Sequence, residues 1–222
     1  MSRILILGST GPSGTDIIRF ALQDRADAKI VLFVRSPQKL PEEIKSNPSV
    51  NIVEGQLEDT AALEQALEGV DAIMSALGPS SSSHPKDAPI AQFYKKLLRM
   101  MRERGIKRLL VLGTASASDP VNDGFSLGYK AMVLGVYMFY WAGYNEFHTL
   151  GEILRGPEGK DIEWTMVRVP ILTEEDKVGT VAGYIGDGKV GLRLARKAFA
   201  RFMVDELGKR EWVCKMPAVS NA

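Results

Sequence analysis

The sequence predicts an α/β fold, a doubly wound parallel sheet with helices on both faces. Short apolar runs of strand length alternate along the chain with longer segments whose apolar residues recur at helical spacing. A glycine-rich turn joins the first apolar run to the first helical segment. At 222 residues the chain is long enough for one domain with a sizeable core. We therefore expect a single domain over residues 1–222.

The first element is a strand that ends in a glycine turn, within the sequence RILILGSTGPSG of residues 3–14. The apolar run covers 4–7, glycines follow at 8, 11 and 14, and the helical spacing of apolar residues begins at Ile17. A side chain at any of these glycines would block the turn, the approach of a phosphate to backbone N–H groups, or the packing of helix on strand. The helix also brings unpaired amides and the positive end of its dipole. The stretch predicts dinucleotide binding, although G-x-x-G-x-x-G differs from G-x-G-x-x-G and a plain strand-to-helix turn is the alternative.

The second strand, expected at 29–34, ends in a basic residue where dinucleotide-binding folds usually carry an acid that holds the ribose 2′-hydroxyl. This chain has Arg35 there, Lys39 four residues later, and no Asp or Glu in 28–40. A carboxylate would repel a 2′-phosphate, whereas a guanidinium grips it with two hydrogen bonds. The sequence thus predicts NADP in preference to NAD, with a solvated arginine at a strand end as the alternative.

A third strand at 50–53, a helix at 60–67 and a fourth strand at 71–76 continue the alternation. The fourth strand leads into a Gly-Pro turn at its carboxyl end, where ligands bind in open α/β sheets. We interpret Ser80 to Ser83 as a mobile loop that closes over a ligand. His84, behind it, is expected to be exposed and inert unless this loop folds inward.

The next helix, expected at 89–104, turns apolar residues inward and basic residues outward, which we interpret as an ordinary solvated face. Gly105 ends this helix, and an apolar fifth strand follows at 107–112. Because strand–crossover–strand connections in one sheet are right-handed, this order of elements gives a doubly wound parallel sheet.

Charge and cysteine content exclude several classes of protein. The chain carries 28 Lys and Arg against 27 Asp and Glu, so no strong field attracts nucleic acid or an anionic membrane. The one cysteine, Cys214, forms no internal disulfide, and with two histidines it makes no metal-ligand cluster of recognised spacing. The first apolar run is too short for a signal sequence, which favours a cytoplasmic protein. The uncharged stretch 131–145 is shorter than the roughly 20 residues of a membrane span, and predicts a buried helix, a lid or a dimer face.

Five segments carry recognisable motifs: GSTGPSG at 8–14, VRSP at 34–37, VEGQLED at 53–59, LEGVDAIMSALG at 67–78 and WTMVRVPIL at 164–172. Together they resemble the atypical short-chain dehydrogenase/reductase superfamily, in particular its NmrA-like NAD(P)H-binding branch, which includes flavin reductase/biliverdin reductase B. The resemblance covers nearly the whole chain and implies a Rossmann-type fold that binds a nicotinamide dinucleotide. Two positions depart from the pattern of the branch: Gln56 replaces the usual Asp, and Val169 is inserted between Arg and Pro.

The resemblance also implies which residues contact the cofactor. Around the pyrophosphate it places seven residues of the glycine turn: Gly8, Thr10, Gly11, Pro12, Ser13, Gly14 and Thr15. Arg35 and Lys39 hold the 2′-phosphate, while Gln56 and Leu57 flank the adenine. An amide at position 56 still hydrogen-bonds an adenine amino group. The nicotinamide end is assigned to six residues: Ala76, Leu77, Gly78, Thr114, Pro170 and Ile171.

Catalysis in ordinary short-chain reductases uses Tyr-x-x-x-Lys with a serine upstream, and this chain has no Tyr-x-x-x-Lys. Tyr144 and His148 keep the spacing with His in place of Lys, one helical turn apart on one face. Tyr144 then donates the proton, His148 supplies the positive charge, and Ser116 stands where the serine belongs. Alternatively these rings only pack under the cofactor and the proton comes from solvent, as the resemblance to flavin and biliverdin reductases allows for a conjugated acceptor.

The second half of the chain, 116–222, is expected to supply substrate-binding elements and complete the sheet, with 1–115 as the cofactor-binding core. A strand or loop from Val178 ends in a glycine-rich turn, followed by a helix at 189–207 and a terminal strand at 211–215. Six residues between 123 and 145 wall an aromatic substrate pocket or pack in the core or a dimer: Phe125, Tyr129, Met132, Tyr137, Tyr140 and Trp141.

The sequence as a whole predicts an NADPH-dependent reductase that transfers hydride to a small conjugated or aromatic acceptor, such as an enone, quinone, flavin-like ring or carbonyl compound. Two alternatives stay open: a non-catalytic NADP-sensing regulator, and a cofactor-retaining isomerase or cyclase without net redox change. The expected partner is a small-molecule substrate, with no nucleic acid and no stable membrane association. The chain itself is expected to be a monomer or homodimer.

Overall fold

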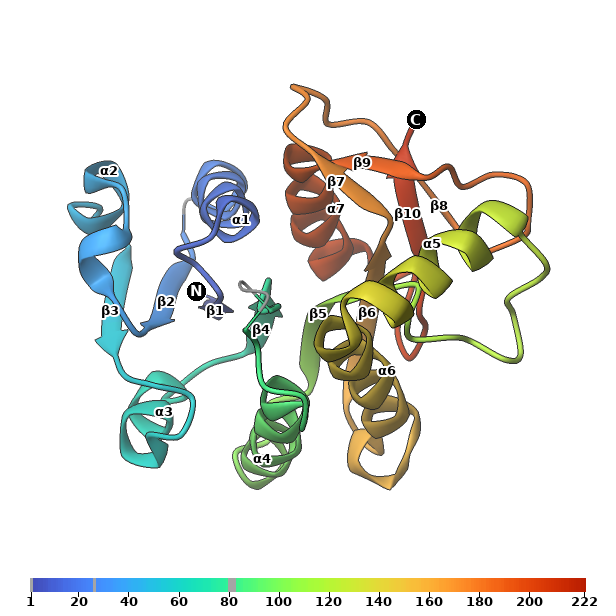
Figure 1. Ribbon diagram of the computed structural model, residues 1–222. Coiled ribbons are helices and arrows are strands. Elements are labelled where there is room, and N and C mark those ends of the chain that lie inside the picture. The colour runs from blue at the N-terminus through green and yellow to red at the C-terminus, as the bar shows by residue number, and fades with distance from the viewer. Residues whose placement is uncertain (1, 26, 80–82) are drawn as a thin grey trace.

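A computed structural model describes residues 2–25, 27–79 and 83–222 (Figure 1). The strands are β1 (Arg3–Leu7), β2 (Lys29–Val34), β3 (Val50–Glu54), β4 (Ala72–Ser75), β5 (Arg108–Thr114), β6 (Glu163–Val169), β7 (Ile171–Thr173), β8 (Thr180–Gly183), β9 (Arg193–Ala195) and β10 (Ala218–Asn221). The α-helices are α1 (Pro12–Asp24), α2 (Glu42–Lys45), α3 (Thr60–Ala66), α4 (Pro89–Glu103), α5 (Leu127–Phe139), α6 (Trp141–Arg155) and α7 (Arg196–Lys209). Two short 3-10 helices are η1 (Pro37–Lys39) and η2 (Pro157–Gly159).

The strands form one eight-stranded sheet in the order β3-β2-β1-β4-β5-β6-β10-β8, and β7 pairs with β9 in a small separate sheet. The pairs from β3 through to β10 are parallel, and β8 joins β10 in the antiparallel direction. The predicted doubly wound parallel sheet is therefore confirmed. The strand order reverses between β1 and β4, so a ligand crevice is expected at the carboxyl ends of these two strands.

Helices cover both faces of the sheet: α1, α2 and α7 lie on one face, and α3, α4 and α6 on the other (Figure 1). Strand β1 shows how the sequence produces both layers. Ile4 and Ile6 pack in the core under α1 and α7, while Leu5 and Leu7 pack in the core under α3, α4 and α6. Successive side chains of a strand point to opposite faces, so a strand covered on both sides needs an unbroken apolar run.

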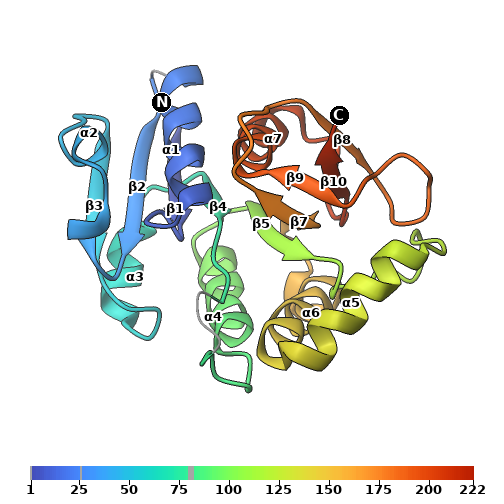
Figure 2. The ribbon, with the colours of Figure 1, turned by 45° about the horizontal axis from the view of Figure 1, so that its top comes forward.

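The uncharged stretch 131–145 forms the end of α5 and the start of α6, with a break at Tyr140. Only Tyr129 of α5 is buried, so the expected buried helix is wrong for this element. Figure 2 shows α5 at the outer edge of the molecule, beside α6. In the part of the chain that the structure describes, no helix is long and apolar enough to cross a membrane.

Two predictions for the C-terminal segment are wrong. The helix predicted at 189–207 begins only at Arg196, because the residues before it form a glycine-rich turn and then β9, which pairs with β7. Of the strand predicted at 211–215, residues 211–214 form turns, in which Cys214 has a positive φ of 56°, and Lys215 alone makes an isolated parallel bridge with Thr165. The last strand is β10, which begins after Pro217 and completes the sheet between β6 and β8.

Candidate cofactor site

The glycine turn between β1 and α1 is held in place by close backbone contacts. Gly8 has a φ of +72°, and a Cβ there would lie 2.7 Å from the carbonyl carbon of Ala76. A Cβ on Gly14 would lie 2.2 Å from the carbonyl oxygen of Gly8. The packing of the chain therefore requires glycine at both positions. Gly11 differs, because the nearest atom to its Cβ would be the Gly8 oxygen at 3.6 Å, an ordinary contact.

The first turn of α1 offers hydrogen-bond donors to an anion. The helix starts at Pro12, its N-cap is Gly11 without a capping side chain, and its first turn contains no acidic residue. The first N–H groups of a helix have no acceptor within the helix, and the helix dipole attracts negative charge to this end. The Oγ1 of Thr15 donates to the Gly11 carbonyl oxygen at 3.1 Å, so this side chain braces the turn. This geometry fits a pyrophosphate, as predicted for the turn.

Ser9 lies in the same turn, but the motifs in the sequence did not place it among the residues that contact the pyrophosphate. Its side chain is buried, and its Oγ has no hydrogen-bond partner among the described residues. A buried hydroxyl without a partner is uncommon and calls for an explanation such as a missing ligand or water. Because Ser9 lies between Gly8 and Thr10, it joins the candidate pyrophosphate residues. Thr10 and Pro12 are exposed beside it, whereas Ser13 is buried.

Arg35 and Lys39 follow β2, the strand next to the one that leads into the glycine turn, and Lys39 is the last residue of η1. In the parallel pairing of β1 with β2, Leu7 is opposite Phe33, so Arg35 follows β2 at the level where Ser9 follows β1. Adjacent strands are about 4.8 Å apart, which places the start of the Arg35 side chain within reach of a ligand on the turn. Both basic side chains are exposed, and no ion pair involves either of them within the described ranges. The arginine is therefore free to bind a phosphate.

The segment after β3 is anchored by helix α4 and by close packing on β2. A Cβ on Gly55 would lie 2.7 Å from Phe33 Cε2, so the chain passes tightly over β2 at this point. Lys96 Nζ on α4 donates to the Leu57 carbonyl oxygen at 2.8 Å, a contact that the solvated-face interpretation of α4 missed. Gln56 stays exposed while Leu57 is half-buried. The two predicted adenine residues thus lie on a fixed loop.

The segment after β4 is fixed by a buried tyrosine. Tyr94 OH on α4 donates to Ser75 Oγ at 2.6 Å, and the Leu77 N–H donates to the same oxygen at 3.3 Å. Burial raises the pKa of Tyr94 well above its usual value, so it remains a neutral donor. Ala76 and Gly78 are half-buried, and a Cβ on Gly78 would touch the ring of Phe147 at 3.4 Å. This places α6 next to the predicted nicotinamide end.

Tyr144 and His148 share one face of α6, as predicted. Their rings stack at 5.4 Å between centroids with 13° between planes, and Trp141 and Tyr137 extend the cluster on the other side of Tyr144. Both side chains are half-buried, so they remain accessible. Along the chain, this helix follows β5, whose end carries Thr114 and the buried Ser116, and precedes β6. The catalytic roles of Tyr144, His148 and Ser116 stay predictions.

The prediction that His84 is exposed and inert is wrong. His84 Nε2 lies 2.5 Å from Oε1 of Glu146, whose side chain is 2% exposed on α6. The Glu146 carboxylate also accepts the N–H groups of Ile90 and Ala91, at 3.0 and 2.8 Å, and so caps α4. Nearby, Asn145 Nδ2 donates to the Lys86 carbonyl oxygen at 2.9 Å. The segment after β4 is thus tied to α6. The predicted mobile loop at Ser80 to Ser83 lies, but for its last residue, outside the described residues.

The six aromatic and methionine residues predicted to line a pocket or to pack in the core or a dimer are divided between separate clusters, with Tyr129 and Met132 in a small core and Tyr137 beside Trp141. Phe125 is exposed under the Lys130 ammonium, and Tyr129 is buried with its OH donating to the Gly191 carbonyl oxygen at 2.8 Å. Burial raises the pKa of Tyr129 to about 12. The Tyr140 ring covers Gly143, where a Cβ would lie 2.4 Å from it. Tyr137 and Trp141 join the ring cluster around Tyr144.

The predicted nicotinamide residues after β6 lie at the same edge of the sheet. Pro170 is buried and Ile171, which opens β7, is exposed. Behind them, Arg168 is 1% exposed and forms a two-armed ion pair with Asp123, at 2.5 and 2.7 Å. Arg168 also donates to the carbonyl oxygens of Ala117 and Met216, so it ties the segment after β5 and the approach to β10 to β6.

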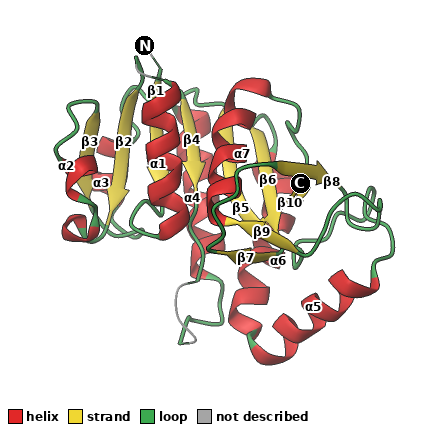
Figure 3. Cartoon of the chain, turned by 90° about the horizontal axis from the view of Figure 1, so that it is seen from above, coloured by secondary structure: helices red, strands yellow, loops and turns green. Residues whose placement is uncertain are grey.

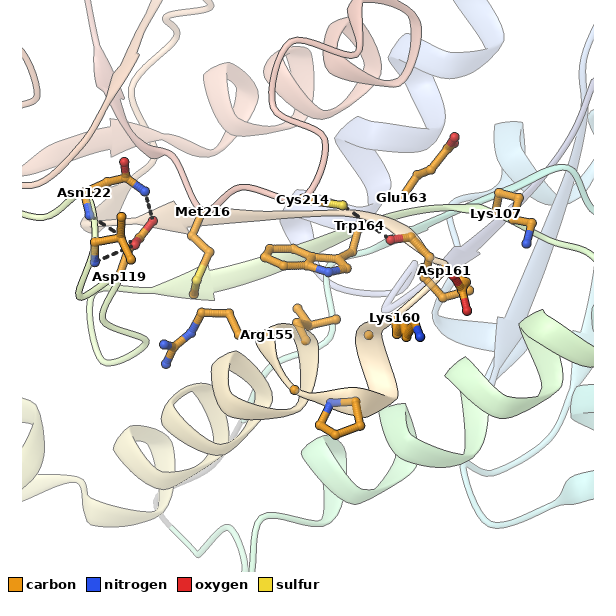
Figure 4. Close-up of a pocket in the computed structure, with 16 residues that line it drawn as sticks. Lys107, Asp119, Asn122, Arg155, Lys160, Asp161, Glu163, Trp164, Cys214 and Met216 are labelled. Carbon is orange, nitrogen blue, oxygen red and sulfur yellow. Dashed lines mark hydrogen bonds between the residues drawn. The ribbon is translucent and has the colours of Figure 1, made fainter.

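A groove of about 870 Å³ lies elsewhere on the molecule (Figure 4). Its floor is the ring of Trp164, and its lining includes Lys107 before β5, Asp161 before β6, and Cys214 and Met216 before β10. These segments precede their strands, while Asp119, Val121 and Asn122 of the segment after β5 line the other end of the groove. None of the predicted cofactor residues is among its lining residues. The glycine turn, Arg35 and the Gly78 segment lie at the carboxyl ends, where doubly wound sheets bind ligands. The groove is therefore not the cofactor site.

Comparison with known proteins agrees with this geometry. The family described as NAD(P)H-binding matches residues 8–210. Oxidoreductase ordB of Dothistroma septosporum is 27% identical over 60% of this chain and 53% of its own length. The probable pinoresinol-lariciresinol reductase 3 of Arabidopsis thaliana is 31% identical over 49% of this chain and 33% of its own length. A short-chain dehydrogenase/reductase from Veillonella parvula, solved in complex with NADP, has a TM-score of 0.77 at 17% identity, covering 99% of this chain and 94% of that one.

The fold and the glycine turn define a nicotinamide-dinucleotide-binding protein of the Rossmann type. The chain belongs to the NAD(P)H-binding family, which confirms the resemblance to atypical short-chain dehydrogenases/reductases. It spans about half, or less, of the length of the curated relatives it matches. In the described part of the chain, no cluster of three or more His, Cys, Asp or Glu residues is arranged to hold a metal ion.

Proposed function

We propose that the protein is an NADP-dependent reductase that delivers hydride from NADPH to a small conjugated or aromatic acceptor. The observation that carries this proposal is the exposed Arg35, one strand away from an uncapped glycine turn and without a carboxylate partner in the described ranges. The NADP complex of the Veillonella parvula structure supports the cofactor. The names of the curated relatives, an oxidoreductase and a probable pinoresinol-lariciresinol reductase, support the reaction class.

Different segments at the carboxyl edge of the sheet bind different parts of the cofactor. The turn from Gly8 to Thr15, Ser9 included, holds the pyrophosphate, and Arg35 with Lys39 binds the 2′-phosphate. Gln56 and Leu57 contact the adenine, while the Ala76–Gly78 and Pro170–Ile171 segments and Thr114 hold the nicotinamide end. When bound, NADPH supplies the hydride.

The accessible face of α6 supplies the group that donates a proton to the acceptor. Tyr144 is placed to donate a proton to a carbonyl oxygen of the acceptor, with His148 stacked on it and Ser116 as a second donor. The stacked rings of Trp141 and Tyr144 offer a flat apolar surface that suits a planar acceptor. An electron-poor, conjugated acceptor needs less help from an acid, which is consistent with histidine at the lysine position.

A thermal-shift titration tests the cofactor, because a ligand that binds the native state raises its melting temperature by mass action. NADPH and NADP should raise it, and NADH should have little effect. The same preparation is then assayed for NADPH oxidation with quinones, enones and flavins. Binding without turnover on any acceptor would favour an NADP-sensing regulator. Product formed without NADPH consumption would favour an isomerase or cyclase.

Replacing Arg35 by alanine should weaken NADPH binding at least about tenfold and leave NADH binding nearly unchanged. The reason is the loss of a charge-assisted, two-armed contact worth about 1.5 to 3 kcal/mol. Isothermal titration with each cofactor measures both affinities. Arg99→Ala, on the outer face of α4 with a side chain 67% exposed, is the matched control and should alter neither. Equal losses for the two cofactors in Arg35→Ala would contradict the 2′-phosphate role.

Replacing Tyr144 by phenylalanine should slow the reduction of a simple carbonyl by about 100-fold, the lower range of general-acid effects, with little change for flavin. The variant keeps the ring stack and removes only the hydroxyl. Steady-state rates with the two acceptors measure the difference, and Tyr137→Phe, which changes a neighbouring ring of the same cluster, is the control. If neither rate changes in Tyr144→Phe, this residue only packs and the proton comes from elsewhere.

A further inference from the structure

Helix α5 carries an apolar stripe that no residue in the described part of the chain covers. Leu127, Ala131, Leu134 and Met138, called the α5 seam below, follow one another at intervals of four, three and four residues. This is the spacing of the a and d positions in a coiled coil, which lie along one line of a helix and pack against a second helix. Leu127, Leu134 and Met138 are 73%, 57% and 65% exposed, and Ala131 is also exposed.

The opposite side of α5 is apolar as well, and it holds the helix on the body of the protein. Tyr129, Met132 and Val133 pack in a small core with Ile185 and Ala218. The helix has one charged residue, Lys130, whose ammonium lies 4.6 Å from the centre of the Phe125 ring. A helix that is apolar on all sides is normally buried on all sides. Among residues 2–25, 27–79 and 83–222, none covers the α5 seam.

Gly135, next to the seam, gives a second and independent observation. A Cβ added there would meet no atom of the described residues within 4 Å, so no contact among them requires a glycine. Glycine in the interior of a helix is less favourable than any residue except proline. Its ordinary use is to let another backbone approach closely. A helix packed against the α5 seam would explain it.

The size of the uncovered surface fits a protein partner. With about 150 to 250 Å² for each large side chain, the exposed fractions on and beside α5 amount to roughly 900 Å². One partner of a standard protein–protein interface contributes about 800 Å², while the largest apolar patch on a typical monomer is about 300 to 600 Å². The contributing residues are Phe125, Leu127, Leu134, Tyr137, Met138, Phe139 and Trp141. Figure 3 shows α5 at the outer edge of the molecule, where a partner has access.

We infer that the partner is a second copy of this chain, with the two α5 helices packed antiparallel across a two-fold axis close to Leu134. In such an arrangement each seam meets an identical seam, as closed symmetric dimers require. Lys130 lies four residues from this axis, so the two ammonium groups are offset by about 12 Å along the helices at 1.5 Å per residue. A membrane-surface helix would instead carry many Lys and Arg residues on a polar face, and α5 has one.

Sedimentation velocity of the full chain tests the dimer over about a hundred-fold range of protein concentration, since association follows mass action. The expected mass is twice the 24.4 kDa of one chain. Leu134→Glu and Leu134→Lys should each be monomeric, because the substituted charges face each other across the axis. An equal mixture of the two variants should recover the dimer. Val178→Glu, the same change at a residue 49% exposed outside α5, should remain dimeric.

Cross-linking gives a test of the axis itself. In a Cys214→Ser background, which removes the exposed native thiol, Leu134→Cys should form a disulfide-linked dimer under mild oxidation. Circular dichroism and melting temperature verify that each variant is folded. A wild-type chain that stays monomeric at every concentration would overturn the inference. So would a Glu and Lys mixture that does not dimerise although the wild type does, or a monomer that co-sediments with phosphatidylcholine vesicles.

Discussion

Replacing Asp123 by alanine should lower the free energy of unfolding by about 3 to 5 kcal/mol, the cost of leaving a buried charge without its partner. Arg168 is 1% exposed and the Asp123 side chain 13%, with N–O distances of 2.5 and 2.7 Å. Asp123 also accepts the N–H groups of Asp119 and Ile185, at 2.8 and 3.2 Å. The substitution therefore removes acceptors for four donors that are shielded from water.

Urea unfolding, followed by circular dichroism, measures this change in free energy from the shift of the midpoint. Asp176→Ala is the matched control, since Asp176 pairs with Lys197 with its side chain 83% exposed. Exposed pairs of this kind add little to stability, so the control should unfold like the wild type. Equal effects in the two variants would show that the Asp123–Arg168 pair is not a structural tie. NADPH affinity measured below the unfolding range shows whether this tie also positions the Pro170 segment.

Much of the first half of the fold follows from local pattern. Strands β1, β2, β4 and β5 are built on apolar runs because both of their faces are covered, and each run is followed by a glycine, proline or polar stop that is visible in the sequence. The C-terminal segment lacks such a pattern. Strands β7 and β9 have three residues each, and their partners lie about 20 residues away, so pairing and not periodicity decides where they form. The residues at 211–215 carry a short apolar run like that of a strand, but they turn back toward Trp164.

The candidate site also contains residues that local sequence pattern predicts and residues whose roles depend on distant contacts. The glycine turn and Arg35 could be predicted because their roles depend on neighbours in sequence. The roles of Glu146 and Ser9 could not be predicted. The hydrogen-bond partners of Glu146 are 55 to 62 residues away in sequence, and the Oγ of Ser9 has no hydrogen-bond partner in the described part of the chain. The one local signal for Glu146 is an acid at a position of α6 where the helical period requires an apolar residue.

Helix α6 joins these features. Its Glu146 side fixes the start of α4 and the segment after β4, while its Tyr144 and His148 side stays accessible. Between them Phe147 touches the Gly78 segment. A single rigid helix thus sets the position of the candidate acid relative to the strand end that approaches the nicotinamide, which is the kind of support that a precise site requires.

Replacing Gly14 and Gly11 of the same turn by alanine, one at a time, should show which glycine is needed for stability and which is needed for cofactor binding. Gly14→Ala places a Cβ 2.2 Å from a backbone oxygen, so we expect a loss of about 3 kcal/mol in the free energy of unfolding together with weak NADPH binding. Gly11→Ala meets its nearest atom at 3.6 Å, and the φ of −82° at Gly11 suits any residue. Its unfolding free energy should change by less than about 1 kcal/mol, the usual scale of an N-cap change.

NADPH binding should nevertheless fall at least about tenfold in Gly11→Ala, because the new methyl group occupies space that the chain itself leaves open beside the unpaired amides of α1. Urea unfolding gives the free energy of unfolding of each variant, and calorimetric titration gives its affinity for NADPH. A stable Gly11→Ala variant with unchanged NADPH affinity would mean that the pyrophosphate does not rest on this turn. The open space at Gly11 would then need another ligand to explain it, and the cofactor assignments of Ser9, Ser13 and Thr15 would fall together with it.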